Sequence, residues 1–174
     1  MTDAAKTIMI VGATGVFGSR LAEHLSTHGD GYQLIVTARS LERANQLAAR
    51  LNKHAQHDVR AVALNRDEDA ARLFETCKPW AVVDCTGPFQ GADYSLARQA
   101  IMAGAHVIDL ADAADYLQGY SPALDDLARE HRVSALAGAS STPALSGAAI
   151  GQLTAGWPSV KDIEIAITPG GRSE

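Results

Sequence analysis

The sequence has few aromatic side chains, few cysteines and no excess of positive charge, and each shortage excludes a class of protein. Phe, Trp and Tyr make up 5% of the 174 residues, so the core must be built from Ala, Val, Leu and Ile. The formal net charge of −5, with no basic stretch to offset it, argues against a nucleic-acid partner. No apolar run approaches the roughly 18 residues of a membrane span, and no signal peptide is visible, so we expect a cytoplasmic protein without a membrane partner.

The cysteines and histidines form no pattern typical of a metal site. Cys77 and Cys85 lack metal-ligand spacing, and two thiols in a cytosolic protein are usually reduced, so we expect both to be buried as small apolar residues. His54 and His57 lie in a polar linker without a third ligand nearby, which favours solvated loop histidines. We therefore expect no metal.

Short apolar runs alternate with helical patterns along most of the chain. Expected strands cover Ile8–Val11, Tyr32–Thr37, Val59–Leu64, Trp80–Cys85, His106–Leu110 and Val133–Leu136. Expected helices comprise one with Phe17, Leu21, Leu25 and His28 on its apolar stripe, then Leu41–Asn52, Glu68–Cys77 and Gln90–Ala103, and two that begin at Ser121 and Thr142 and run to about His131 and Thr154. Because the strands are apolar throughout, as buried parallel strands are, this pattern predicts an α/β fold: a Rossmann-type, doubly wound sheet of six parallel strands.

A glycine-rich stretch after the first expected strand organises the rest of the chain. It runs from Gly12 to Gly18 with the spacing G-x-x-G-x-x-G and opens the first helix. Gly12 permits a sharp turn, Gly15 lets a pyrophosphate approach bare backbone at the helix N-terminus, and Gly18 lets helix and strand pack closely. The alternative is an ordinary glycine turn. The position between strand and helix favours dinucleotide binding by this stretch, Thr14 included.

The residues after the second expected strand indicate which dinucleotide is bound. A site for NAD usually places an acidic residue there, but this chain has Ala38-Arg39-Ser40. Arg39 can pair with the 2′-phosphate of NADP(H), and Ser40 can add a hydroxyl donor. The alternative is that Arg39 is a solvated loop residue and that Ser40 caps the next helix; Ser40 can serve both purposes. We predict NADP(H).

Polar residues at other strand ends are further candidates. Asp84 lies inside an apolar strand and needs a partner or a ligand. Thr86, Gly87 and Pro88 follow it at the edge where ligands bind, and Phe89 is either an apolar wall beside a ring or a core residue of a β-turn.

Several acidic and amide side chains admit two interpretations. Asn65 or Asp67 can contact adenine, although a helix cap is favoured for Asp67. Asp109, Asp112 and Asp115 can be read as a cation site, but acids are common at helix N-termini and that interpretation is favoured.

The pattern changes after Gly156. Ile163, Ile165 and Ile167 alternate with polar or small residues, which is typical of a half-buried strand. We expect a dinucleotide-binding domain over residues 1–156, and over 157–174 the first strand, at Lys161–Thr168, of a second α+β domain for substrate binding or dimerisation. A lone strand needs a partner, so we expect the chain to be a fragment or to be completed by another chain.

Five stretches together resemble the NADP-binding domain of the saccharopine dehydrogenase (reductase) family: 12–18, 38–40, 82–89, 106–110 and 138–143. The resemblance implies that the pyrophosphate is lined by Gly15, Val16 and Phe17, the 2′-phosphate by Arg39 and Ser40, the nicotinamide ribose by Thr86, Gly87 and Pro88, and the region of the ring by Asp109 and Leu110. Asp84 stands where the family usually has Asn.

The resemblance implies an NADP-dependent oxidoreductase that transfers hydride at an amine, imine or carbonyl carbon. Its small-molecule substrate would be held through the second domain, so this chain alone would be inactive. No catalytic residue is assigned, and Asp109 is only a weak candidate. A non-catalytic NADP(H)-sensing regulator stays open as an alternative, as does a homo-oligomer. A short-chain reductase is disfavoured because Tyr94 and Tyr116 are followed four positions later by Arg98 and Tyr120, not by Lys.

Overall fold

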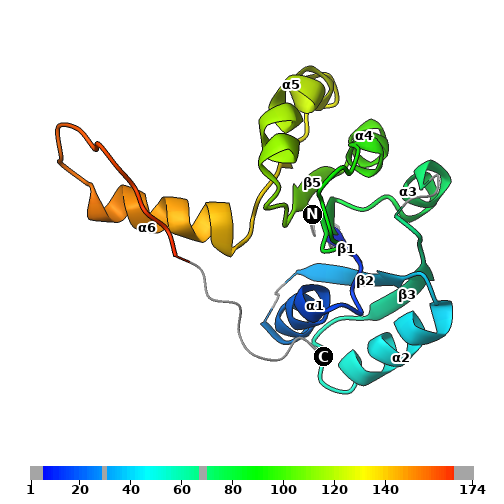
Figure 1. Cartoon of the computed structure of the whole chain (residues 1–174). Coiled ribbons are helices and arrows are strands. Elements are labelled where there is room, and N and C mark those ends of the chain that lie inside the picture. Colours follow the sequence, from blue (N-terminus) through cyan, green and yellow to red (C-terminus); the bar gives the residue numbers. More distant parts are fainter. Residues whose placement is uncertain (1–5, 29–30, 67–69, 167–174) are drawn as a thin grey trace.

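Six parallel strands form one sheet in the computed structural model, which describes residues 6–28, 31–66 and 70–166 (Figure 1). The spatial order is β3-β2-β1-β4-β5-β6, and every neighbouring pair is parallel. Since the chain crosses from β3 to β4 over two strands, the winding direction changes between β1 and β4, where such sheets bind ligands. The predicted fold class is confirmed. The strands are β1 (Lys6–Val11), β2 (Tyr32–Ala38), β3 (Val59–Ala63), β4 (Ala81–Asp84), β5 (His106–Asp109) and β6 (Ala135–Leu136).

Helices cover both faces of this sheet. On one face lie α1 (Val16–His28) and α2 (Leu41–Leu51), and on the other α3 (Ala71–Cys77), α4 (Ser95–Met102) and α5 (Ala114–Glu130). Successive residues of β1 alternate between the two cores: Ile8 and Ile10 join the first, Met9 and Val11 the second. None of the helices in the described part of the chain combines the length and apolar character that a membrane span needs.

The buried stripe of α1 agrees with the expected one only in part: Leu21 and Leu25 are partly buried and pack against the core. Phe17 is 66% exposed and His28 is exposed as well, whereas Gly18, Ala22 and Ser26 are buried. The small residues lie against the sheet because the glycine loop brings the helix so close that a large side chain has no room there.

The helix expected to begin at Ser121 begins seven residues earlier, at Ala114. Pro122 lies inside α5, where it cannot donate to the preceding turn and costs about 3 kcal/mol. The helix continues through it because Tyr116, Tyr120 and Leu124 form one buried stripe at intervals of four residues. A buried apolar face therefore outweighs the local proline signal.

Two other helices are shorter than expected. α4 begins at Ser95, not at Gln90, because Gly91 has a φ of +72° and the carboxylate of Asp93 accepts the N–H of Ser95 at 3.0 Å. α3 begins at Ala71, and the predicted cap Asp67 lies outside the described residues.

The last part of the chain departs most from expectation. β6 has only two residues, and the segment expected as one helix from Thr142 comprises a π-helical turn (Ser141–Leu145) and α6 (Ser146–Leu153). α6 has no buried residue and projects away from the sheet (Figure 1). Residues 161–166 are exposed and form no strand, since no neighbouring strand offers hydrogen bonds to them. Ile167 and Thr168 lie outside the described residues.

Candidate cofactor-binding site

The loop between β1 and α1 has the shape that its glycine spacing predicts. Gly12 has a φ of +73°, where a side chain is strained, and a Cβ on Gly18 would overlap the carbonyl oxygen of Gly12. The N–H of Ala13 donates to the carbonyl oxygen of Thr37 at 2.9 Å, which ties the loop to β2. The first N–H groups of α1, which have no partner within the helix, therefore lie at the carboxyl edge of the sheet.

A polar pocket of about 460 Å³, called the arginine pocket below, opens over this loop. Its lining includes Thr14, Gly15, Arg39, Arg43 and Asn65, and no carboxylate is among its lining residues in the described ranges. Ser40 is not part of this lining: it caps α2, and its Oγ accepts the N–H of Arg43 at 3.3 Å. The predicted cap is therefore confirmed for Ser40, and its contact with a phosphate stays a prediction.

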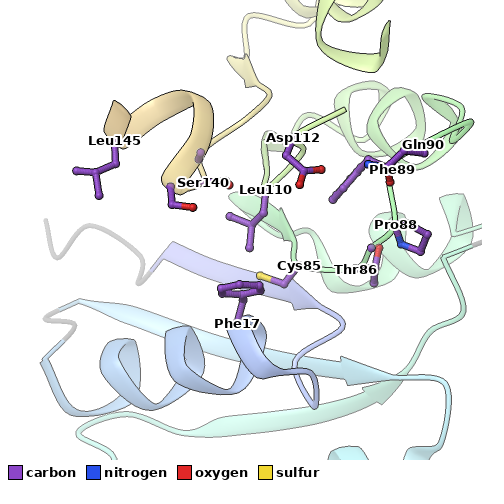
Figure 2. Close-up of a pocket in the computed structure, with 13 residues that line it drawn as sticks. Phe17, Cys85, Thr86, Pro88, Phe89, Gln90, Leu110, Asp112, Ser140 and Leu145 are labelled. Carbon is purple, nitrogen blue, oxygen red and sulfur yellow. The ribbon is translucent and has the colours of Figure 1, made fainter. Parts of the chain in front are cut away.

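A second pocket, of about 570 Å³ and called the apolar pocket below, adjoins the first (Figure 2). Phe17 from α1 and Leu110 from the end of β5 come from opposite sides of it, and Leu145 lies on its outer side. The exposure of Phe17 is explained by this position, because its ring faces the pocket instead of the sheet. The polar residues of its lining are Thr86, Gln90, Asp112, Ser140 and Ser141.

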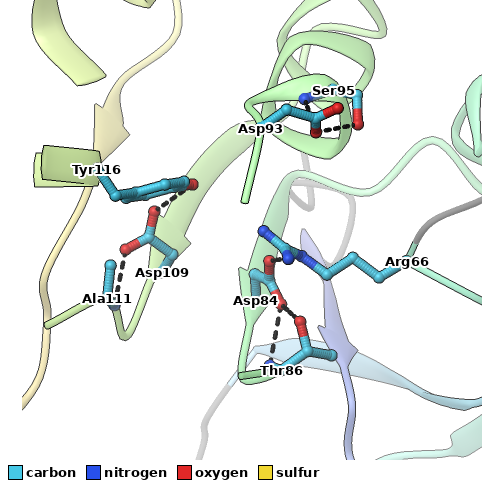
Figure 3. Close-up of polar contacts among 8 residues, drawn as sticks. All are labelled: Arg66, Asp84, Thr86, Asp93, Ser95, Asp109, Ala111 and Tyr116. Carbon is cyan, nitrogen blue, oxygen red and sulfur yellow. Dashed lines mark hydrogen bonds and ion pairs between the residues drawn. The ribbon is translucent and has the colours of Figure 1, made fainter. Parts of the chain in front are cut away.

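The two pockets share the segment from Cys85 to Pro88, which follows β4. Asp84 holds this segment in place. Its Oδ1 accepts two hydrogen bonds from Thr86, one from the backbone N–H at 2.9 Å and one from the side-chain hydroxyl (Figure 3). Arg66 Nε donates to Asp84 Oδ2 at 2.9 Å, and the guanidinium carbon lies 5.0 Å from the centre of the Phe89 ring. The buried carboxylate thus has the partner that the sequence required, and the partner is a cation that reaches across from the end of β3.

Asp109 was expected near the nicotinamide ring, but its side chain is buried below the surface of the pockets. Only 2% of it is exposed, and its carboxylate accepts the N–H groups of Ala111 and Gly138 and the hydroxyl of Tyr116. Burial raises the pKa of Asp109 above its usual range, and these hydrogen bonds oppose the rise. The side chain lines neither pocket, so this geometry gives no support to a catalytic role; its neighbour Leu110 does line the apolar pocket.

The other residues singled out in the sequence lie partly in the core and partly along the two pockets. Phe89 is 4% exposed and packs in the core, as one interpretation expected; it also lines the apolar pocket, and its role as a wall beside a ring stays a prediction. Asn65 lines the arginine pocket, whereas Val16 is 56% exposed and lines neither. Cys77 and Cys85, expected to be buried as small apolar residues, are only partly buried, although both pack against the core. Cys85 borders both pockets, and burial raises its pKa to about 12.

No metal centre is apparent in the described parts of the chain. No three His, Cys, Asp or Glu side chains gather closely enough there to hold an ion. The three acids discussed above are separated: Asp109 is buried, Asp112 borders the apolar pocket and Asp115 lies in the first turn of α5. His54 and His57 are exposed.

Two arginines of the site were not predicted. Arg43 lies one helical turn beyond Ser40, so a search for cations on the first turn of α2 finds it. Arg66 is found only by asking which cation could balance Asp84, because the two are 18 positions apart.

The donor set of the arginine pocket fits NADP(H). The 2′-phosphate is an anion, and Arg39 and Arg43 are cations for which the described residues offer no ion pair. Gly15 lines the same pocket without a side chain, which leaves room for a phosphate at the N-terminus of α1.

Fold, glycine loop and paired pockets define a dinucleotide-binding domain of the oxidoreductase type. The family described as "Saccharopine dehydrogenase NADP binding domain" matches residues 8–139, well over half of the sequence. The chain belongs to this family, and the predicted cofactor, NADP(H), is confirmed at the level of the family.

Solved structures share the fold at low sequence identity. A short-chain dehydrogenase from Sphingobium yanoikuyae in complex with NADPH has a TM-score of 0.54 and 16% identity, over 76% of this chain and 70% of that one. A metagenomic short-chain oxidoreductase in complex with NADP has a TM-score of 0.54 and 20% identity over 77% and 82%. The citronellol catabolism dehydrogenase AtuB of Pseudomonas aeruginosa PAO1 has a TM-score of 0.60 and 16% identity over 76% and 72%. Comparison with curated proteins finds no match.

Proposed function

We propose that this chain is the cofactor-binding part of an NADP(H)-dependent oxidoreductase that acts at an amine, imine or carbonyl carbon. The observation that carries the proposal is the pair of adjoining pockets with opposite lining, one with arginines and one with apolar side chains, joined by residues 85–88. A dinucleotide has the matching asymmetry, with a phosphorylated adenosine at one end and a nearly flat nicotinamide at the other.

Under this proposal the arginine pocket holds the adenosine end. Arg39 and Arg43 contact the 2′-phosphate, and Asn65 lies beside the adenine. The amides at the start of α1, exposed by Gly15, contact the pyrophosphate. The arginines thereby select NADP(H) over NAD(H), since they would face an uncharged hydroxyl in NAD(H).

The apolar pocket holds the nicotinamide end in this proposal. Phe17 and Leu110 confine the ring and exclude water, while Thr86 lies beside its ribose. The reduced nicotinamide, when bound, supplies a hydride. The substrate would approach from the open side near Leu145, and a role in holding it is proposed for the domain expected from residue 157 onward.

A second candidate function is an NADP(H)-sensing protein without turnover. It is favoured by the small number of groups in the apolar pocket that could move a proton. Burial raises the pKa of Cys85 to about 12, so its thiol releases a proton poorly near neutral pH. Asp109 is buried and does not line the pocket. Asp112 is the one carboxyl group among the described residues that line it. Oxidation of NADPH by a carbonyl or imine compound in the presence of this protein would rule out the sensor.

Fluorescence titration with NADPH and with NADH tests the proposal. We expect tighter binding of NADPH, and about a 10- to 100-fold loss of NADPH affinity in Arg39→Ala or Arg43→Ala, because each removes a charge-assisted hydrogen bond. NADH binding should change little. Arg98→Ala is the control, since Arg98 is exposed on α4 and lines neither pocket. Equal losses for both nucleotides would refute the assigned role of the arginines, and binding of neither would refute the proposed function.

A further inference from the structure

Asp109 makes hydrogen bonds to three separate segments from one buried position at the end of β5. Its Oδ1 accepts the N–H of Ala111 at 3.0 Å, and its Oδ2 accepts the Tyr116 hydroxyl at 3.2 Å (Figure 3). Its Oδ1 also accepts the N–H of Gly138 at 2.9 Å. Its backbone carbonyl accepts the N–H of Ala139 at 2.8 Å. One residue therefore joins the loop after β5, the start of α5 and the loop after β6.

The joined segments form one side of the apolar pocket. Leu110 and Asp112 lie on the loop after β5, and Ala139, Ser140 and Ser141 lie on the loop after β6. Asp109 itself does not reach the pocket. Its contribution to a bound molecule must therefore pass through the positions of these two loops.

The loop after β6 depends on this residue for its course. Gly138 turns the chain there with a φ of +79°, and two consecutive N–H groups, those of Gly138 and Ala139, are both received by Asp109. β6 contributes only two residues of ladder, so the sheet itself gives the loop little support. Without the carboxylate, the Gly138 N–H would lose its acceptor in a buried position.

Asp84 makes a similar hydrogen bond on the opposite side of the apolar pocket. Asp84 is in register with Asp109 on the neighbouring strand, and its carboxylate also accepts the N–H two residues further on, that of Thr86. The two carboxylates differ in the charges around them. Asp84 is paired with the cation Arg66, whereas the groups that face Asp109 are Tyr116, Tyr120 and the carboxylate of Asp84. The two aspartates thus fix both sides of one pocket by the same local bond.

We propose that Asp109 is a positioning residue that fixes the two loops on one side of the apolar pocket and thereby sets the affinity for the nicotinamide end of NADP(H). The inference rests on the proposed function. If its loss left the loops in the binding arrangement only about a tenth of the time, apparent affinity for that end would fall about tenfold. The adenosine end would be unaffected, since neither loop lines the arginine pocket.

Comparing two ligands isolates this effect. Adenosine 2′,5′-bisphosphate has only the adenosine end, whereas NADPH has both, so the ratio of their dissociation constants reports on the nicotinamide end. In Asp109→Ala we expect NADPH binding to weaken about tenfold and adenosine 2′,5′-bisphosphate binding to stay within about twofold. The change in nicotinamide fluorescence on binding should shrink in the same variant. Asp126→Ala, an exposed change on α5, is the control.

Asp109→Asn tests the hydrogen bonds separately from the charge. Its Oδ1 can still accept both backbone N–H groups, and its amide can donate to the Tyr116 oxygen, so NADPH affinity should return to within about threefold of wild type. If the ratio of the two dissociation constants is unchanged in folded Asp109→Ala, whether neither ligand loses affinity or both lose it equally, the proposal is overturned. If Asp109→Ala does not fold, Asp109→Leu carries the test, because leucine fills the space of the carboxylate without accepting the N–H groups of Ala111 and Gly138, and an unchanged ratio there overturns the proposal. Failure of both ligands to bind the wild-type protein would instead refute the proposed function.

Discussion

Gly15 and Gly18 lie one turn apart, yet the space around them predicts different defects for their alanine variants. A Cβ on Gly18 would overlap the carbonyl oxygen of Gly12 and lie 2.8 Å from the Cα of Ala13, and both of these are backbone atoms that cannot rotate away. Overpacking of this kind costs about 1–3 kcal/mol, and alanine recovers about 1 kcal/mol of helix propensity. Because both contacts are with backbone and closer than 3 Å, the cost lies in the upper part of that range, about 2–3 kcal/mol, so we expect Gly18→Ala to lower the free energy of unfolding by about 1–2 kcal/mol.

Gly15→Ala should affect binding instead. The nearest atom to a Cβ there is the Gly12 oxygen at 3.3 Å, and Gly15 has no positive φ, so the free energy of unfolding should change by less than about 0.5 kcal/mol. The new methyl group would project where Gly15 lines the arginine pocket. Because it would keep the pyrophosphate from the amides of α1, NADPH affinity should fall at least about tenfold.

Urea denaturation and NADPH titration of the two variants separate these effects. Gly147→Ala is the control: it lies in α6, and a Cβ there meets nothing within 4 Å. Wild-type stability in Gly18→Ala would refute the argument from close packing. Wild-type NADPH affinity in Gly15→Ala would refute the placement of the pyrophosphate.

Three further predictions concern the charged and thiol groups beside the pockets: a substitution, a labelling rate and a pH dependence. Arg66→Ala should destabilise the protein by about 3 kcal/mol in urea denaturation, because the carboxylate of Asp84 would stay buried without its cation; a change below about 1 kcal/mol would contradict this. Cys85 should react slowly with iodoacetamide at pH 7.5, since burial raises its pKa to about 12; mass spectrometry that finds Cys85 alkylated as fast as a free thiol would contradict it. For Asp109 the folded pKa lies above the ordinary 3.8, so the folded state retains a proton that the unfolded state has released. The contribution of Asp109 to stability should therefore fall as pH rises from about 3.8 through the folded pKa and be level above it, so the pH dependence of unfolding in Asp109→Asn should lack this fall relative to wild type.

The sequence predicted the sheet and its ligand edge because those follow from local signals. β1, the glycine loop and α1 are adjacent in the chain, so spacing alone predicts their geometry. The strands at Ile8–Val11 and Tyr32–Thr37 were found within one or two residues of their ends, since buried parallel strands are apolar on both faces.

Errors arose where a distant contact outweighed a local signal. Ser121-Pro122 is a strong helix start, but the packing of Tyr116 and Tyr120 against the sheet extends α5 through it. Phe17 was placed on the buried stripe of α1 by its spacing, whereas the fully buried positions of the helix are Gly18, Ala22 and Ser26, because the helix lies close to the sheet at Gly18. Arg66 was missed because its role depends on the crossover from β3 to β4, which brings it to Asp84.

Under the proposed function, the residues that select the cofactor are separate from those that line the apolar pocket. Arg39 and Arg43 line the arginine pocket but not the apolar pocket, whereas Phe17 and Leu110 line the apolar pocket but not the arginine pocket. The shared segment at 85–88 is held by Asp84, whose partner Arg66 lies on the arginine side. Substitutions at Arg39 should therefore alter the preference for NADP(H) over NAD(H) without moving Phe17 and Leu110, the residues proposed to confine the nicotinamide ring. Substitutions at Arg66 should disturb both ends, because they act on the segment common to the two pockets.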